Sequence, residues 1–168
     1  MTLRLVRHGE TAWSAERRYT GRTDLPLSAT GIVQAEALGA IAKESYDSIW
    51  CSDLRRAVET ASHMGVSATA TPRLREFDFG DLEGMRWCDL DEVTKNGLLS
   101  FDGFRAPGGG TVEAFASTVD RFVASLGAGR HLLITHGGVI RHLLRRVGDD
   151  RDVRPGTWCD IDADSVRP

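Results

Sequence analysis

The chain has 168 residues, a formal net charge of −3, a hydrophobic fraction of 41% and a charged fraction of 27%. This composition is ordinary for a globular protein, and the length suits a single domain over residues 1–168 with a core of its own. The balance of charge argues against a nucleic-acid surface, and no apolar run approaches the length of a membrane span.

Short apolar segments alternate along the chain with longer amphipathic ones. Residues 3–7 (LRLVR) and 131–136 (HLLITH) are rich in Leu, Ile and Val and end abruptly in polar residues, which is typical of core strands in a parallel sheet. Three further strands are expected at 48–52, 67–72 and 157–163, the second of them weak.

Four helices are expected between these strands, at residues 28–44, 53–64, 112–127 and 138–148. Ser28, Ser52 and Thr111 can cap the first three, because a hydroxyl oxygen can accept a free N–H of the first turn. Gly127 is suited to end the third helix. The alternation of strands and helices predicts a layered α/β fold with a mainly parallel sheet.

A histidine followed by glycine stands at the end of two predicted strands, as RHG at 7–9 and HGG at 136–138. The carboxyl ends of parallel strands share one edge, where ligands bind, so His8 and His136 are expected to meet over one pocket. Each histidine could instead only cap its own strand. The pair together with Arg7 favours a site for an anion.

A second source of positive charge is Arg55 and Arg56, in the first turns of the helix predicted at 53–64. Cations are unfavourable at the positive N-terminus of a helix unless an anion lies nearby. The alternative is a solvated surface pair, which would suit one of the two arginines.

Four motifs in chain order resemble those of the histidine phosphatase superfamily, which has the phosphoglycerate-mutase-like fold. They are RHGET at 7–11, SDLRRAVET at 52–60, LREFDFGDLEG at 74–84 and THGGVIR at 135–141. The resemblance covers nearly the whole chain. It implies a three-layer α/β/α sandwich with a mainly parallel sheet.

The resemblance also implies roles for matching residues. His8 matches the nucleophile that becomes phosphorylated, and His136 matches the second histidine of the site. Arg7 and Arg56 match two arginines that clamp the phosphate. Arg55 falls on a variable position and is expected to be the solvated one.

Two carboxylates compete for the role of proton donor. Glu76, in Arg-Glu-Phe, matches the donor of the family, and Glu83, in Leu-Glu-Gly, is the alternative. In the implied scheme a neutral His8 attacks phosphorus, and the carboxylic acid protonates the departing oxygen before activating water. Nothing in this scheme requires a metal or another cofactor.

Weaker candidates surround these residues. Segment 21–28 (GRTDLPLS) resembles that of the family's phosphatase members, notably α-ribazole phosphatase, and its Arg22 could contact a substrate anion or be an exposed loop residue. Ser14 stands where many mutases carry Asn. The candidates for substrate or phosphate contact beyond the clamping arginines are Ser14, Thr20, Gly21, Arg22 and Gly137.

The favoured function is hydrolysis of a small phosphorylated metabolite, α-ribazole phosphate being one candidate. The alternatives are a phosphoglycerate mutase, and a protein phosphohistidine phosphatase or regulatory binder. Mutases carry Asn where Gly138 stands, and additional basic residues after the proton donor. Here that segment is acidic, and if its carboxylates face the pocket mouth they repel the anionic product that a mutase must retain: Asp78, Asp81, Glu83, Asp89, Asp91 and Glu92.

The expected partner is therefore a small phosphorylated substrate, with neither nucleic acid nor membrane. Such a substrate predicts a pocket narrowed by residues around 86–106, whereas a protein substrate predicts an open groove. Cys51, Cys88 and Cys159 form no CxxC motif and are expected to be reduced thiols in a cytoplasmic protein without a signal peptide. The sequence gives no indication of oligomeric state.

Overall fold

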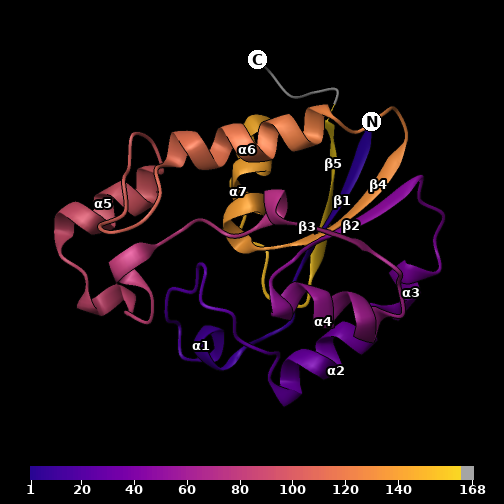
Figure 1. The fold of residues 1–168 in the computed structure, drawn as a ribbon, viewed down its shortest axis with the longest axis horizontal. Helices are drawn as coiled ribbons and strands as arrows, with labels where there is room; N and C mark the ends of the chain where they lie inside the picture. The colour runs from indigo at the N-terminus through magenta and orange to yellow at the C-terminus, as the bar shows by residue number, and fades with distance from the viewer. Residues whose placement is uncertain (164–168) are drawn as a thin grey trace.

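The computed structural model describes residues 1–163, and these form a five-stranded sheet (Figure 1). The strands are β1 (Thr2–Arg7), β2 (Ser48–Ser52), β3 (Thr69–Thr71), β4 (Arg130–Thr135) and β5 (Trp158–Asp162). They lie in the order β3-β2-β4-β1-β5. All neighbours pair in parallel except β5, which runs antiparallel to β1 at one edge. The expectation of a mainly parallel sheet is confirmed.

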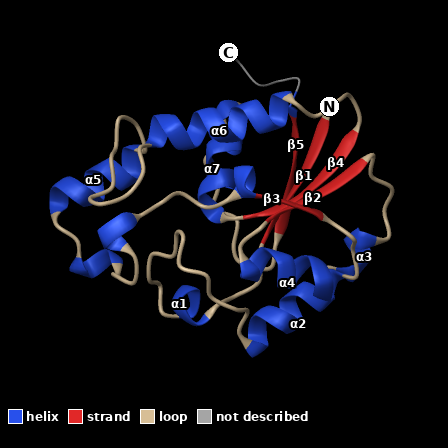
Figure 2. Ribbon diagram, in the orientation of Figure 1, coloured by secondary structure: helices blue, strands red, loops and turns tan. Residues whose placement is uncertain are grey.

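Helices cover both faces of this sheet (Figures 1 and 2). One face carries α6 (Val112–Ala124) and α7 (Gly137–Arg146), and the other carries α2 (Ala29–Ala37), α3 (Gly39–Ala42) and α4 (Arg55–Met64). Alternate residues of the central strands enter the two cores: Leu5 and Leu133 pack toward α6 and α7, while Val6 and Ile134 pack toward the other layer. Burial on both faces explains why these strands are continuous apolar runs. The three-layer sandwich is confirmed.

The helix caps match the sequence in two of three cases. Ser28 accepts the amide N–H of Gly31 at 3.0 Å, and Thr111 caps α6 in the same way. Ser52 does not cap α4, because it is the last residue of β2 and the helix begins only at Arg55. The amide of Arg55 instead donates to the carboxylate of Asp24, which comes from a distant loop.

Two other boundaries differ from expectation. The helix expected at 28–44 is interrupted at Leu38, directly before Gly39, and forms α2 and α3. The helix expected to end at Gly127 ends at Ala124 with Ser125 as its C-cap, and the hydroxyl of Ser125 donates to the carbonyl of Phe122 at 2.6 Å.

Several short elements have no clear sequence signal. These are α1 (Ala12–Ala15), α5 (Glu92–Ser100) and the 3₁₀ helices η1 (Pro72–Leu74), η2 (Gly80–Leu82) and η3 (Trp87–Asp89). Helix α5 lies apart from the sheet, beyond one end of α6 (Figure 1). It buries a single side chain, Leu98, so its sequence lacks an apolar stripe. Among the described residues, no helix is both long and apolar enough to cross a membrane.

Candidate active site

Two histidines leave neighbouring strands at the same edge of the sheet. Strands β1 and β4 pair in parallel with Arg7 opposite Thr135, so His8 and His136 are the next residues on each side. Their ring centroids lie 5.1 Å apart with the planes tilted by 60°. His8 is 5% exposed and His136 is fully buried. The two rings therefore meet, as the pairing of their strands requires.

The side chain of Arg56 lies against both rings. Its Nε is 3.3 Å from Nε2 of His8 and 3.2 Å from Nδ1 of His136. Its two terminal nitrogens donate to the backbone carbonyls of Gly21 and Thr23, at 2.8 and 3.0 Å. These four contacts fix a fully buried guanidinium directly behind the histidine pair.

The hydrogen bonds of the two rings indicate where their protons lie. Nδ1 of His8 is 2.7 Å from the carbonyl oxygen of Gly9, so Nδ1 carries the proton and Nε2 keeps its lone pair. Nδ1 of His136 accepts from Arg56, which leaves the proton on its Nε2. Burial, with the charges of Arg56 and Arg7 adding to it, lowers the pKa of both histidines well below the usual range. His8 is therefore neutral near pH 7 and can act as a nucleophile.

We expect neither His8 nor His136 to take up a proton between pH 8 and pH 6. Unfolded histidines do so at about pH 6.5, so acidification below that value should also destabilise the folded state. NMR of histidine-labelled protein checks this, with the His8→Ala and His136→Ala variants assigning the resonances. A titration midpoint near pH 6.5 for either ring would contradict the assignment.

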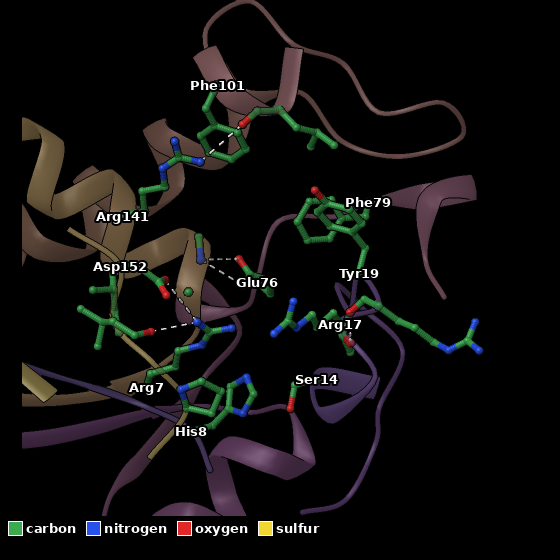
Figure 3. Close-up of a pocket in the computed structure, with 18 of the residues that line it drawn as sticks. Arg7, His8, Ser14, Arg17, Tyr19, Glu76, Phe79, Phe101, Arg141 and Asp152 are labelled. Atoms are coloured by element: carbon green, nitrogen blue, oxygen red, sulfur yellow. Dashed lines mark hydrogen bonds and ion pairs between the residues drawn. The ribbon is translucent and has the colours of Figure 1, made fainter. Parts of the chain in front are cut away.

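Two buried donors beside His8 have no hydrogen-bond partner among the described residues: Nε of Arg7 and Nε2 of His136. Figure 3 shows Arg7 and His8 together on one wall of a pocket. Nη1 of Arg7 donates to the carbonyl of Val153 at 2.8 Å and lies 3.7 Å from Asp152. Unpaired buried donors are costly, and the oxygens of one bound anion would satisfy both.

Glu76 reaches the same pocket and is held by backbone amides (Figure 3). It accepts from the amide of Phe77 at 2.9 Å, and both of its oxygens lie near 3 Å from the amide of Gly138 (3.1 and 3.0 Å). A Cβ on residue 138 would collide with Oε1 of Glu76. Glycine at this position therefore lets the first turn of α7 hold the carboxylate.

The competing carboxylate of Glu83 serves a nearby loop. It accepts from the amides of Arg22 and Thr23 at 2.6 and 2.8 Å, and from the hydroxyl of Thr23. Glu83 is not among the residues that line the pocket. Of the two carboxylates, Glu76 is the one that a bound substrate can reach.

The weaker candidates divide into two groups. Ser14, Thr20 and Gly137 line the pocket, whereas Gly21 lies buried behind it and Arg22 lies exposed outside it. The hydroxyl of Ser14 takes part in the N-terminal cap of α1, where it accepts from the amide of Thr11 at 2.8 Å. Gly137 packs against Arg7, since a Cβ there would lie 3.1 Å from the guanidinium carbon.

Most of the pocket wall comes from residues that no motif indicated. Apolar and aromatic members outside the motifs include Tyr19, Trp87, Leu98, Leu99 and Phe101, and the arginines outside them are Arg17, Arg18 and Arg151. The pocket has a volume of about 570 Å³. The one available signal was the Arg17–Arg18 pair that follows the RHGET motif. No three His, Cys, Asp or Glu side chains of residues 1–163 are grouped to hold a metal ion.

The condition of an acidic pocket mouth is not met, because none of the six carboxylates of residues 78–92 lines the pocket. Several instead accept backbone amides close by in the chain: Asp78 from Gly80 at 3.1 Å, and Asp91 from Thr94 as the N-cap of α5. The acidic residues that do line the pocket are Asp150 and Asp152, with Glu76.

Comparison with known proteins gives consistent matches. The model of the histidine phosphatase superfamily (branch 1) matches residues 3–163. The chain is 34% identical over 160 residues to the adenosylcobalamin/alpha-ribazole phosphatase of Escherichia coli (strain K12), covering 88% of this chain and 79% of that protein. It is 32% identical over 161 residues to a metal-independent phosphoserine phosphatase of Arabidopsis thaliana, and the match covers 85% of this chain and 67% of that protein. A solved structure of phosphoglycerate mutase from Thermus thermophilus superposes with a TM-score of 0.91 at 48% identity. The superposition covers 96% of this chain and 93% of that chain.

Proposed function

Because this chain belongs to the histidine phosphatase superfamily, we propose that it hydrolyses a small phosphate monoester through a phosphohistidine on Nε2 of His8, without a metal. One observation carries the proposal. The neutral ring of His8 lies beside two unpaired buried donors, Nε of Arg7 and Nε2 of His136. Oxygens of a phosphate would accept from both and bring phosphorus to Nε2 of His8, whose lone pair then exchanges the Nε–H of Arg56 for phosphorus.

The proposed reaction has two displacements. In the first, Nε2 of His8 forms a bond to phosphorus as the bond to the leaving oxygen breaks, and Glu76 gives that oxygen a proton. Arg7, Arg56 and His136 stabilise charge on the transferring phosphoryl group. In the second, Glu76 takes a proton from water, which attacks phosphorus. The P–N bond breaks, phosphate leaves and neutral His8 is restored.

Glu76→Gln should lower kcat/KM for an alkyl phosphate by about 10²–10⁴-fold, because an alkoxide departs poorly without a proton. The same variant should lose much less on p-nitrophenyl phosphate, whose phenolate needs little protonation. Since kcat/KM reports only formation of the phosphohistidine, steady-state kinetics on both esters isolates this step. Glu83→Gln is the matched control and should affect both esters equally. If Glu76→Gln lost kcat/KM equally on the alkyl and the aryl ester, another residue would be the proton donor.

The remainder of the pocket supports a small organic leaving group. Its volume of about 570 Å³ is in the usual range for small-molecule sites. Side chains between Trp87 and Phe101 narrow it, and the aromatic rings of Tyr19 and Phe79 form part of its wall. A protein substrate would need a more open groove. The relative in Escherichia coli makes α-ribazole phosphate one candidate substrate.

A phosphoglycerate mutase is the second candidate, because arginines such as Arg17, Arg141 and Arg151 line the pocket and a solved relative is a mutase. Hydrolysis is favoured by the apolar wall and by Gly138. Mutases usually carry Asn at position 138, and a side chain there would make the carboxylate of Glu76 turn away from the amide of residue 138.

Assay of the purified protein separates the two reactions. We expect release of inorganic phosphate from p-nitrophenyl phosphate in the presence of EDTA, and no exchange between 2- and 3-phosphoglycerate. Exchange that outpaces phosphate release, with stimulation by bisphosphoglycerate, would favour the mutase instead. Loss of activity in EDTA, restored by a divalent metal, would contradict both.

We also assign the enzyme to a reducing compartment, the cytoplasm. Cys51, Cys88 and Cys159 are all unpaired, and two of them are buried. Burial raises the pKa of the Cys51 thiol to about 11, so this side chain stays protonated and behaves as a small apolar group.

A further inference from the structure

Two arginines on one face of α7 bind the end of α5. Arg141 donates to the carbonyls of Leu98 and Leu99 at 3.4 and 3.2 Å. Arg145, one turn later, donates to the carbonyl of Leu99 at 3.1 Å and to that of Ser100 at 2.8 Å. The last carbonyls of a helix have no partner within the helix and carry its negative end. The two guanidinium groups supply those partners.

The same two arginines share one carboxylate. Nε of Arg141 lies 3.2 Å from Oδ1 of Asp150, and Arg145 binds both oxygens of that carboxylate, at 2.9 and 3.2 Å. Asp150 offsets the repulsion between two cations four residues apart on a helix. We call Arg141, Arg145 and Asp150 the clasp.

The clasp joins two parts of the pocket wall that are distant in sequence. On one side, the end of α5 contributes Leu98, Leu99 and Phe101 to the wall. On the other side, Asp150 begins the loop whose Val153 carbonyl holds Arg7. Figure 3 shows Arg141 near Phe101 at one end of the pocket and Asp152 beside Arg7 lower on the same wall.

The other attachments of helix α5 are apolar. It lies away from the sheet and buries only Leu98, in a small cluster with Leu82 and Leu90 (Figure 1). Gly97 packs closely on the ring of Phe104, and Phe101, which ends the helix in a left-handed conformation (φ 51°), contacts the rings of Phe77 and Phe115. The clasp supplies the polar contacts that fix the end of the helix against α7.

We propose that the clasp positions the leaving-group wall of the pocket and so determines how well large leaving groups are accepted. The inference rests on the proposed phosphatase function. Arg145 is a positioning residue, because it does not line the pocket and acts through α5 and Asp150. At the phosphate end, His8, His136 and Arg56 hold one another through contacts that do not involve the clasp.

The test compares Arg145→Gln with a matched control, Arg121→Gln, which removes an arginine bound to Ser117 on α6. Phenyl phosphate and 1-naphthyl phosphate serve as small and large esters, and inorganic phosphate serves as a competitive inhibitor. In Arg145→Gln, kcat/KM for the naphthyl ester should fall about tenfold relative to the phenyl ester, mainly through KM. The inhibition constant of phosphate should stay within about twofold, and Arg121→Gln should change neither quantity.

Several results would overturn the proposal. For Arg145→Gln these results are an equal loss of kcat/KM on both esters, no loss of kcat/KM on either ester, or a tenfold rise in the inhibition constant of phosphate. A second readout does not need catalysis: amide hydrogen exchange over residues 98–103 should be faster in Arg145→Gln than in the wild type or Arg121→Gln. Unchanged exchange would contradict the clasp. If the wild type hydrolysed neither ester, the proposed function would fail. The proposal on the clasp would then be tested by calorimetry, which compares the affinities of the wild type and Arg145→Gln for 1-naphthyl phosphate and for inorganic phosphate.

Discussion

His8→Ala is expected to reduce turnover of p-nitrophenyl phosphate by at least about 10⁴-fold. The other catalytic side chains act together with the nucleophile, so the site keeps little activity when the nucleophile is removed. The residual site still holds Arg7, Arg56 and His136, so the inhibitor phosphate should still bind. Initial rates and phosphate inhibition measured on the same preparation distinguish loss of chemistry from loss of binding.

The matched control is His142→Gln. His142 lies on α7, pairs with Asp120 at 2.9 Å and does not line the pocket. It should keep most of the wild-type rate, and circular dichroism should report the same fold for both variants. Wild-type turnover in His8→Ala would exclude the covalent route.

Arg56→Gln is expected to lower kcat/KM by about 10³-fold, whereas Arg55→Gln should change it by less than about twofold. Arg56 is fully buried and its Nε contacts both histidines. The side chain of Arg55 is 57% exposed and pairs with Glu59 on the helix surface. Steady-state kinetics on one aryl ester measures both variants.

Because Gln at position 56 leaves the carbonyls of Gly21 and Thr23 without their donor, stability must be measured alongside activity. A thermal unfolding curve shows whether the variant is folded at the assay temperature. A folded Arg56→Gln enzyme with a large rise in the phosphate inhibition constant fits a phosphate clamp. A larger loss of kcat/KM in Arg55→Gln than in Arg56→Gln would show that the helix presents Arg55 to the substrate.

The central strands and the histidine pair could be predicted because strong local patterns determine them. Residues 3–7 and 131–136 are buried on both faces, so each is an uninterrupted apolar run that ends at a polar residue. Once the two strands are taken as parallel, His8 and His136 must share an edge. Ser28 and Thr111 were predictable for a similar reason, since an N-cap acts within three residues of itself.

Contacts between distant segments could not be predicted. Ser52 looked like the cap of α4, but Asp24 takes that role from a loop 31 residues away. The choice between Glu76 and Glu83 lay within one motif, and it depends on which backbone amides each carboxylate meets: Gly138 for the first and Thr23 for the second.

The pocket wall was the least predictable part. Among the described residues, the non-glycine positions with positive φ are Arg17 (58°) and Phe101 (51°), and both line the pocket. Bulky side chains rarely adopt this conformation, and nothing in the local sequence calls for it. A run of carboxylates such as that at residues 78–92 does not reveal which of them cap their own turns, as Asp91 does.

The central claim is that phosphate passes through nitrogen of His8, and the most direct measurement is to trap that adduct. Wild-type enzyme mixed with a labelled aryl phosphate and quenched within one turnover should carry one phosphoryl group that is labile in acid and stable in alkali. Peptide mass spectrometry under alkaline conditions should locate it on His8, and His8→Ala should yield none. An acid-stable adduct on Ser14 or Thr11, or phosphate release without any adduct, would contradict the account.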